Sequence, residues 1–201
     1  MRLGLHAIAA VALASAAAPA AHAADTDPAA ARIESFSRSL VDVMKQGPSL
    51  GAKGRFRKLE PVLQDDFDLA LMTRFAVGPT WATMSEADHQ ALIRAFSRLT
   101  AASYAHNFDR FDGERFDVNP TVQTRGPDKI VISHLTPQGR APVDLTYRMR
   151  QSDGAWKIVD VYYGAISQLT TRRSDFAGPL ASGGAKGLIA HLEATTAKLM
   201  Q

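Results

Sequence analysis

The amino-acid sequence predicts an α+β fold, in which a four-stranded antiparallel sheet, arranged as a meander, has helices packed on one face. Three observations support this prediction. Helical apolar spacing fills the first half of the chain, strand-like alternation runs from about residue 114 to 163, and helical spacing then returns. Short turns join the strands, which makes neighbouring strands antiparallel. Helices on one side of such a sheet favour an apolar pocket between the layers.

Residues 1–23 have the layout of a cleavable signal peptide. Arg2 gives a positive start, an alanine-rich apolar stretch follows, and Ala21-His22-Ala23 is a small-residue cleavage site. The stretch is shorter than the ~20 residues that span a membrane. We therefore expect an exported protein whose mature part, residues 24–201, is one domain.

Composition excludes several classes of protein. The chain has no cysteine, so it has no disulfide, no thiolate metal site and no thiol nucleophile. Its 23 basic and 20 acidic residues give a net charge of +3, which is too balanced for a nucleic-acid binder. The histidines of the mature part stand apart from one another in the sequence, without a carboxylate at ligand spacing, so no metal site and no cofactor are predicted.

Capping signals mark where the helices of the first half begin. Asp27 precedes Pro28, which suits the first position of a helix, and Ser85 opens a capping box with Asp88. The aspartates at 65, 66 and 68 stand at a helix junction, where capping is their ordinary role. The expected helices span about residues 28–46, 50–65, 67–76 and 86–107.

The β-rich part shows one strand with clear alternation. Apolar Val143, Leu145, Tyr147 and Met149 alternate with polar residues, so one face of this strand is apolar and the other is wet. Residues 152–154 form a hairpin turn. The expected strands are an interrupted one at about 116–122, then 129–135, 143–150 and 156–163. Two helices, 166–176 and 188–200, follow, with a break between them at 178–186.

Catalytic motifs are missing from the sequence. There is no H-E-x-x-H, no G-x-G-x-x-G after a strand and no G-x-S-x-G elbow. An enzyme remains an alternative, because a cone-shaped α+β fold can hold Asp160 or Tyr147 against an apolar wall as a general acid or base. A structural adaptor of the cell envelope, without a pocket, is a further alternative.

Two basic clusters are candidates for contact with a partner or with lipid headgroups. Lys53, Arg55, Arg57 and Lys58 lie close together in the second expected helix, and Arg172-Arg173 follows the sheet. Each cluster is interpreted either as a solvated surface or as a docking patch for an acidic partner or lipid headgroups.

A longer pattern runs through nearly the whole mature chain. Its helical half contains Arg55-Phe56, Leu59, Pro61, Phe67-Asp68, Met72, Gly78, Trp81, Ala95-Phe96 and Tyr104. Its sheet half contains Val143, Leu145, Tyr147, then Gly154-x-Trp156-Lys157-x-x-Asp160-Val161, Ser167, Arg173 and Phe176. In order and spacing this pattern resembles the MlaC family, also called the toluene-tolerance auxiliary family, of periplasmic lipid-binding proteins. Ala165-Ile166-Ser167 followed by Thr-Arg-Arg-Ser-Asp-Phe is most similar to its hopanoid-associated branch, HpnM.

The resemblance implies a soluble periplasmic carrier. Such a protein moves a lipid ligand, a hopanoid or a phospholipid, between inner and outer membranes with an inner-membrane transporter or its substrate-binding component, and contacts the membrane transiently. A lipid needs this help because each buried CH₂ is worth about 0.8 kcal/mol, so a chain crossing water alone meets a large barrier.

The predicted pocket wall combines apolar residues of the sheet face and of the facing helices. Each could instead belong to a dense core, and periodicity cannot distinguish the two. Release of the lipid would require the helices to move away from the sheet. The predicted lining residues are Phe67, Leu71, Phe75, Trp81, Phe96, Leu99, Val143, Leu145, Tyr147, Trp156, Ile158, Val161 and Ile166.

Overall fold

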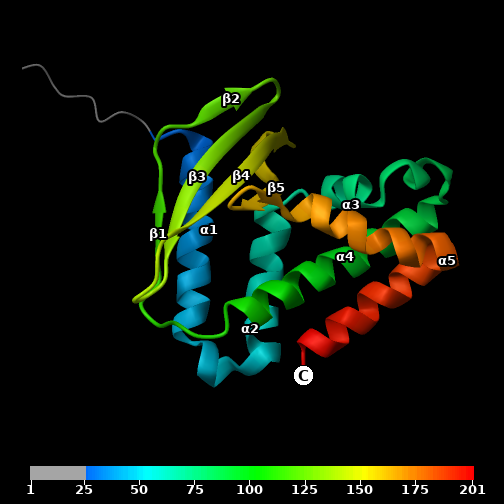
Figure 1. Ribbon diagram of the computed structural model, residues 1–201, viewed down its shortest axis with the longest axis horizontal. Coiled ribbons are helices and arrows are strands. Elements are labelled where there is room, and N and C mark those ends of the chain that lie inside the picture. Colours follow the sequence, from blue (N-terminus) through cyan, green and yellow to red (C-terminus); the bar gives the residue numbers. More distant parts are fainter. Residues whose placement is uncertain (1–25) are drawn as a thin grey trace, which may run out of the picture.

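The structure, a computed structural model, describes residues 26–201 (Figure 1). The predicted signal peptide and its cleavage site at Ala23 lie outside the described residues. The helices are α1 (Pro28–Lys45), α2 (Gly47–Asp66), α3 (Leu69–Val77), the 3-10 helix η1 (Gly78–Thr83), α4 (Glu86–Asn107) and α5 (Gln168–Leu199). The strands are β1 (Arg115–Val118), β2 (Gln123–Arg125), β3 (Asp128–Thr136), β4 (Val143–Ser152), β5 (Ala155–Tyr163) and β6 (Ile166–Ser167).

Side-chain caps fix the starts of four helices, and at α5 the Ser167 hydroxyl accepts a hydrogen bond from the Thr170 amide at 3.0 Å. The Asp27 carboxylate accepts a hydrogen bond from the Ala29 amide at 2.8 Å, and the Ser85 hydroxyl accepts one from the Asp88 amide at 3.1 Å. Asp68 caps α3 through the Leu71 amide at 2.9 Å. The third helix therefore starts two residues later than predicted, because Phe67 is extended (φ −110°, ψ 144°).

The sheet is antiparallel and has six strands in the described residues, so the prediction of four was wrong in number. The order is β1-β3-β4-β5-β6, and β2 also pairs with β3. Two physical reasons account for the difference. The interrupted first strand forms two short strands that pair with opposite ends of β3. Ile166 and Ser167, expected to open a helix, instead pair with Tyr163 and Tyr162 as β6.

The two helices predicted after the sheet are present, and the label α5 spans both of them (Figure 1). α5 runs from Gln168 to Leu199 and bends at Gly184, whose φ of +57° suits glycine and disfavours other residues. Gly184 lies within the expected break at 178–186, so the prediction of a break there is confirmed.

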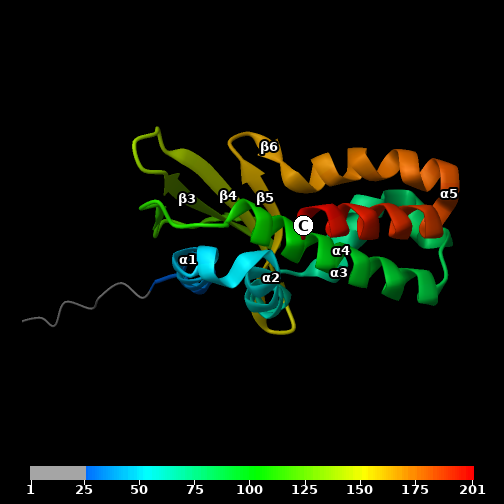
Figure 2. The same cartoon turned by 90° about the horizontal axis from the view of Figure 1, so that it is seen from below.

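The helices divide into two groups around the sheet. Figure 2 shows α1 and α2 below the sheet, whereas α3, α4 and α5 extend together beyond the end where β5 and β6 lie. The expectation that all helices pack on one sheet face therefore holds for only part of them. Val131, Leu145, Tyr147 and Met149 are buried on the inner face, as the alternation in β4 predicts.

A β-bulge in β5 changes which side chains face inward. Met149 pairs with Ile158 but Arg148 pairs with Asp160, so Val159 is the extra residue. The bulge puts Ile158 and Val161 on the same inner face, although they are three residues apart.

Candidate functional site

An apolar cavity of about 410 Å³ lies where the end of the sheet meets α4 and α5. Both layers contribute to its wall. The apolar lining residues are Phe67, Met72, Phe96, Tyr104, Phe108, Leu145, Val161 and Leu169, and the polar or rim residues are Thr100, Ser103, Asn107, Tyr163, Gln168 and Arg172.

One stripe of α4 forms much of the wall. Phe96, Thr100, Ser103, Tyr104 and Asn107 follow the i, i+4, i+7, i+8, i+11 spacing that places residues on one helical face. The stripe changes from apolar to polar toward the carboxyl end of the helix. The cavity therefore combines an apolar wall with hydrogen-bonding side chains at its edge.

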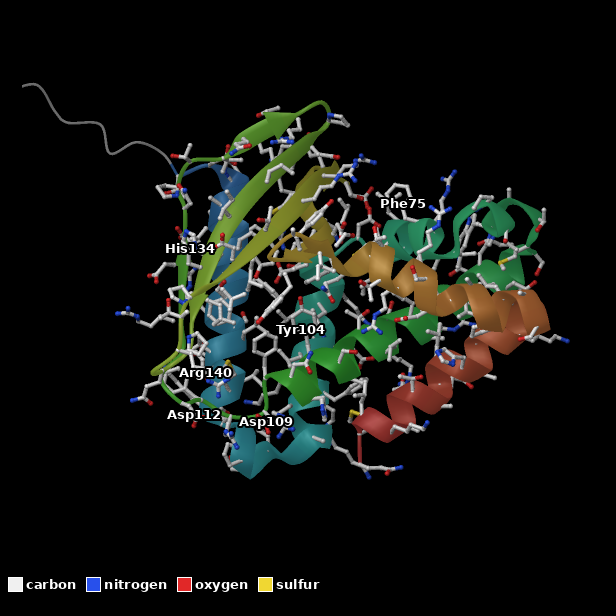
Figure 3. The ribbon with its side chains drawn as sticks, in the orientation of Figure 1. Phe75, Tyr104, Asp109, Asp112, His134 and Arg140 are labelled. Atoms are coloured by element: carbon white, nitrogen blue, oxygen red, sulfur yellow. The ribbon has the colours of Figure 1, made fainter. Side chains whose placement is uncertain are left out.

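Aromatic rings build the inner end of the cavity. The Tyr104 ring packs edge-on against Phe36 and Phe67, with centroid distances of 5.7 and 5.8 Å, and stacks on Phe108 at 5.5 Å. Figure 3 shows Tyr104 inside the molecule, between α4 and the sheet. Burial raises the pKa of Tyr104 well above its ordinary value, so its hydroxyl stays neutral. The inner wall is consequently uncharged.

Arg172 provides a positive charge at the rim. Its Nη2 donates to the Ser103 hydroxyl at 3.3 Å, which ties α5 to α4, and its Nη1 lies 3.9 Å from the Asp175 carboxylate. Arg172 and Asp175 are both partly exposed, so this ion pair is weak. The guanidinium therefore has donors left for an anionic group at the rim.

The predicted lining residues fall into two sets. Phe67, Phe96, Leu145 and Val161 line the cavity. Tyr147, Ile158 and Leu99 are buried in the core away from it, and Ile166 is 62% exposed. The remaining five, Leu71, Phe75, Trp81, Val143 and Trp156, are half-buried outside the lining.

Two of those half-buried residues have other partners. Trp81 stacks on His89 with a centroid distance of 4.0 Å, and Trp156 lies under Lys129, whose Nζ is 4.6 Å from the ring centroid. Sequence reasoning missed Met72, Tyr104, Phe108 and Leu169 as lining residues, together with the polar rim. The polar stripe of α4 was the signal that could have indicated the rim.

The first basic cluster is not one surface. Arg55 is buried, and it donates from Nε to the carbonyl of Ala105 at 2.7 Å and from Nη1 to that of Gly47 at 3.0 Å. The interpretation of Arg55 as a surface residue was wrong, because its side chain is buried and donates to main-chain carbonyls of α4 and α2. Lys53, Arg57 and Lys58 are exposed.

The two arginines of the second basic cluster also lie in different surroundings. Arg172 lies at the cavity rim, whereas the guanidinium of Arg173 lies against Gly78, 3.2 Å from the place where a Cβ would stand. Only Arg172 is therefore placed to meet a ligand in the cavity.

The two residues of the enzyme alternative have structural surroundings. One carboxylate oxygen of Asp160 accepts from the Ser167 hydroxyl at 2.7 Å and the other from the Leu169 amide at 3.1 Å, so Asp160 anchors the start of α5. Burial raises the pKa of Tyr147, which leaves it a poor acid or base near neutral pH.

Other surface hollows are more polar or more open. One of about 600 Å³ between α2, α3, α4 and the β4–β5 hairpin shares Phe67 with the cavity, so the two spaces meet at this residue. Within residues 26–201 there is no cluster of three His, Asp or Glu side chains that could hold a metal ion. No helix in that range has the length and apolarity needed to cross a membrane.

These features define an α+β binding domain whose cavity suits a ligand with an apolar body and a polar end. The chain belongs to the MlaC protein family, which it matches over residues 34–194. That match covers most of α1, most of α5 and every element between them, including every residue that lines the cavity.

A solved structure has the same fold. It is that of a phospholipid-binding protein from Ralstonia solanacearum in complex with a phospholipid. The two chains superpose with a TM-score of 0.76 at 22% sequence identity, over 87% of this chain and 100% of the other. At this identity the likeness establishes the fold, and it agrees with the family assignment.

Proposed function

We propose that this protein is a soluble periplasmic lipid carrier that encloses the apolar part of a membrane lipid in the cavity between β4, β5, α4 and α5. The observation that carries the proposal is the cavity itself, which has an apolar wall from both layers and a polar rim around Arg172. The family assignment supports the same function, because proteins of the MlaC family work in the periplasm.

The size of the cavity fits one hydrocarbon chain. A cavity of ~150 Å³ binds benzene, so 410 Å³ corresponds to roughly 16 carbon atoms on the same scale. At about 0.8 kcal/mol for each CH₂ group, burying a chain of that length is favoured over leaving it in water by more than 10 kcal/mol. A two-chain phospholipid or a hopanoid exceeds this volume. Loading a whole lipid therefore requires α4 and α5 to move away from the sheet.

The cargo is either a phospholipid or a hopanoid. The phospholipid bound to the Ralstonia protein favours the first, and the sequence around Ile166 favours the second. The partner is an inner-membrane transporter or its substrate-binding component, which receives or supplies the lipid. Export by the signal peptide of residues 1–23 would place the protein between the two membranes.

Lipid extracted from the purified protein tests the proposal. Mass spectrometry should find a phospholipid or hopanoid at close to one molecule per protein, and protein stripped of lipid should recover it from vesicles. Vesicles containing both lipids identify the preferred cargo. Protein that carries no lipid and takes up neither lipid from vesicles or detergent micelles would refute the carrier function.

A further inference from the structure

The rim of the cavity carries two exposed apolar side chains on one turn. Among residues 26–201 only three large hydrophobic side chains are exposed, namely Phe111 (36%), Tyr163 (53%) and Ile166 (62%). Tyr163 and Ile166 flank Gly164 and Ala165, which are also exposed, so the turn between β5 and β6 is uncharged and apolar. We call residues 163–166 the rim turn. Figure 2 shows it at the edge of the molecule, beside the start of α5.

The pairing of strands links the rim turn to the cavity wall. Leu145 pairs with Tyr163, and Tyr163 pairs with Ile166, so the three side chains form one row on one face of the sheet. Exposure rises along that row, from 8% at Leu145 to 62% at Ile166. An apolar surface thus runs without interruption from the cavity to the outside of the protein.

The rim turn is held in place. The Gly164 amide donates to the carbonyl of Asp144 at 2.9 Å, and Asp160 accepts hydrogen bonds from Ser167 and Leu169 directly after the turn. The exposed side chains are therefore presented by a fixed backbone. The rim turn therefore offers a small preformed apolar surface that another apolar phase can cover.

From this row and its neighbours we infer that the rim turn inserts into the surface of a lipid bilayer while the cavity exchanges its ligand. The inference rests on the proposed carrier function and adds the surface through which it meets the membrane. A bilayer matches both sides of the opening, because acyl chains fit Tyr163 and Ile166 and anionic headgroups fit Arg172 across the cavity. The nearby carboxylate of Asp144 belongs to the opposite face of β4, since Leu145 faces inward.

The contact is suited to a shuttle because it is weak. Even a single myristoyl chain gives only marginal, reversible membrane binding. Two side chains bury less apolar surface than that, so the protein leaves the bilayer once the lipid has moved. A lipid that slides along the Leu145–Tyr163–Ile166 row stays in apolar contact during the transfer.

The test separates docking from lipid binding. Ile166→Ser and Ile166→Asp change a side chain outside the cavity lining, and Phe111→Ser is the matched control, because it removes the third exposed hydrophobic residue. Phe111 lies between Asp109 and Asp112, which Figure 3 shows at the corner of the molecule away from Phe75 and α3. Removing the burial of about two CH₂ groups lowers affinity for a bilayer roughly tenfold.

Two measurements decide the outcome. The first is the rate at which lipid-free protein extracts a fluorescent phospholipid from vesicles of phosphatidylethanolamine and phosphatidylglycerol. The second is equilibrium binding of a monomeric lysophospholipid, which needs no bilayer. We expect Ile166→Ser to slow extraction about tenfold, Ile166→Asp to slow it more, and neither to change lysophospholipid binding.

Each other result has a defined meaning. Extraction by both Ile166 variants at the wild-type rate would overturn the docking inference and leave the carrier function intact. The docking inference would also be overturned if Phe111→Ser slowed extraction to the same degree. It would likewise be overturned if the Ile166 variants extracted lipid normally from vesicles and failed only in lipid transfer to an added protein partner. Wild-type protein that binds neither lysophospholipid nor vesicle lipid would contradict the carrier function itself.

Discussion

Filling the cavity should weaken lipid binding strongly without unfolding the protein. Thr100 lies in the middle of the α4 stripe and lines the cavity, and its hydroxyl donates only to the Phe96 carbonyl within the same helix. Thr100→Trp places an indole there. An indole is about one and a half times the size of benzene, so it takes up roughly 220 Å³ on the scale of the ~150 Å³ benzene cavity. That is more than half of the 410 Å³ available.

The expected loss of affinity follows from the cavity volume that the indole occupies. About eight carbon atoms no longer fit, which corresponds to roughly 6 kcal/mol of burial at about 0.8 kcal/mol per CH₂. Part of a displaced chain can still lie at the open rim, so we expect a decrease of at least about 100-fold rather than the full amount. The assay is titration of the lipid-free protein with a single-chain lysophospholipid, together with mass spectrometry of co-purified lipid.

Ser97→Trp is the control on the same helix. Ser97 is half-buried like Thr100 and its hydroxyl donates to the Ile93 carbonyl at 2.7 Å, but it lines the separate hollow beside α2 and α3. We expect this variant to bind lipid as the wild type does. The reasoning fails if folded Thr100→Trp protein binds lipid with unchanged affinity, or if both variants lose binding equally.

Three further predictions concern stability and the cavity wall. Arg55→Leu removes two buried hydrogen bonds to main-chain carbonyls and should lower the free energy of unfolding by about 2–4 kcal/mol in urea titrations, whereas exposed Lys58→Ala should change it by less than about 0.5 kcal/mol. Burial would raise the pKa of Asp128, but hydrogen bonds from Arg150 and Arg148 more than offset it and hold the pKa below 3.8. The ionised carboxylate therefore stabilises the fold above that pH, and this stabilisation is lost as the pH falls through the lowered pKa. Asp128→Asn should make the free energy of unfolding depend less on pH in the acid range, and an unchanged pH dependence would contradict this. Phe67→Ala joins the cavity to the neighbouring hollow, so it should cost about 3–5 kcal/mol of stability yet let the protein retain longer chains, measured by mass spectrometry of bound lipid.

Local signals predicted most of the secondary structure. The helix at 86–107 has the predicted bounds, and the caps at Asp27 and Ser85 form as their sequences indicate. These signals succeed because a cap or an alternating strand depends on residues only a few positions apart. They fail where one segment suits two structures: Ile166 has the composition of a helix start, yet it pairs with Tyr163 as an edge strand.

The identity of the cavity wall could be predicted only in part. Phe67, Phe96, Leu145 and Val161 line the cavity, whereas Leu99 from the same set packs in the core. Periodicity tells which way a side chain points from its own helix or strand. It does not tell whether the opposite layer meets that side chain or leaves space, because this depends on how far apart the layers stand.

The sequence by itself determined the α+β class, the helical starts, the apolar face of β4 and the resemblance to the MlaC family, since all of these reside in local order and spacing. Tertiary structure alone decided that Arg55 is buried between helix ends, that Asp160 anchors α5, and that Arg172 stands at the rim of an apolar cavity. The physical reason is that a cavity is a place where packing is incomplete. Its position is set by distances between elements far apart in the chain, and no short stretch of sequence encodes those distances.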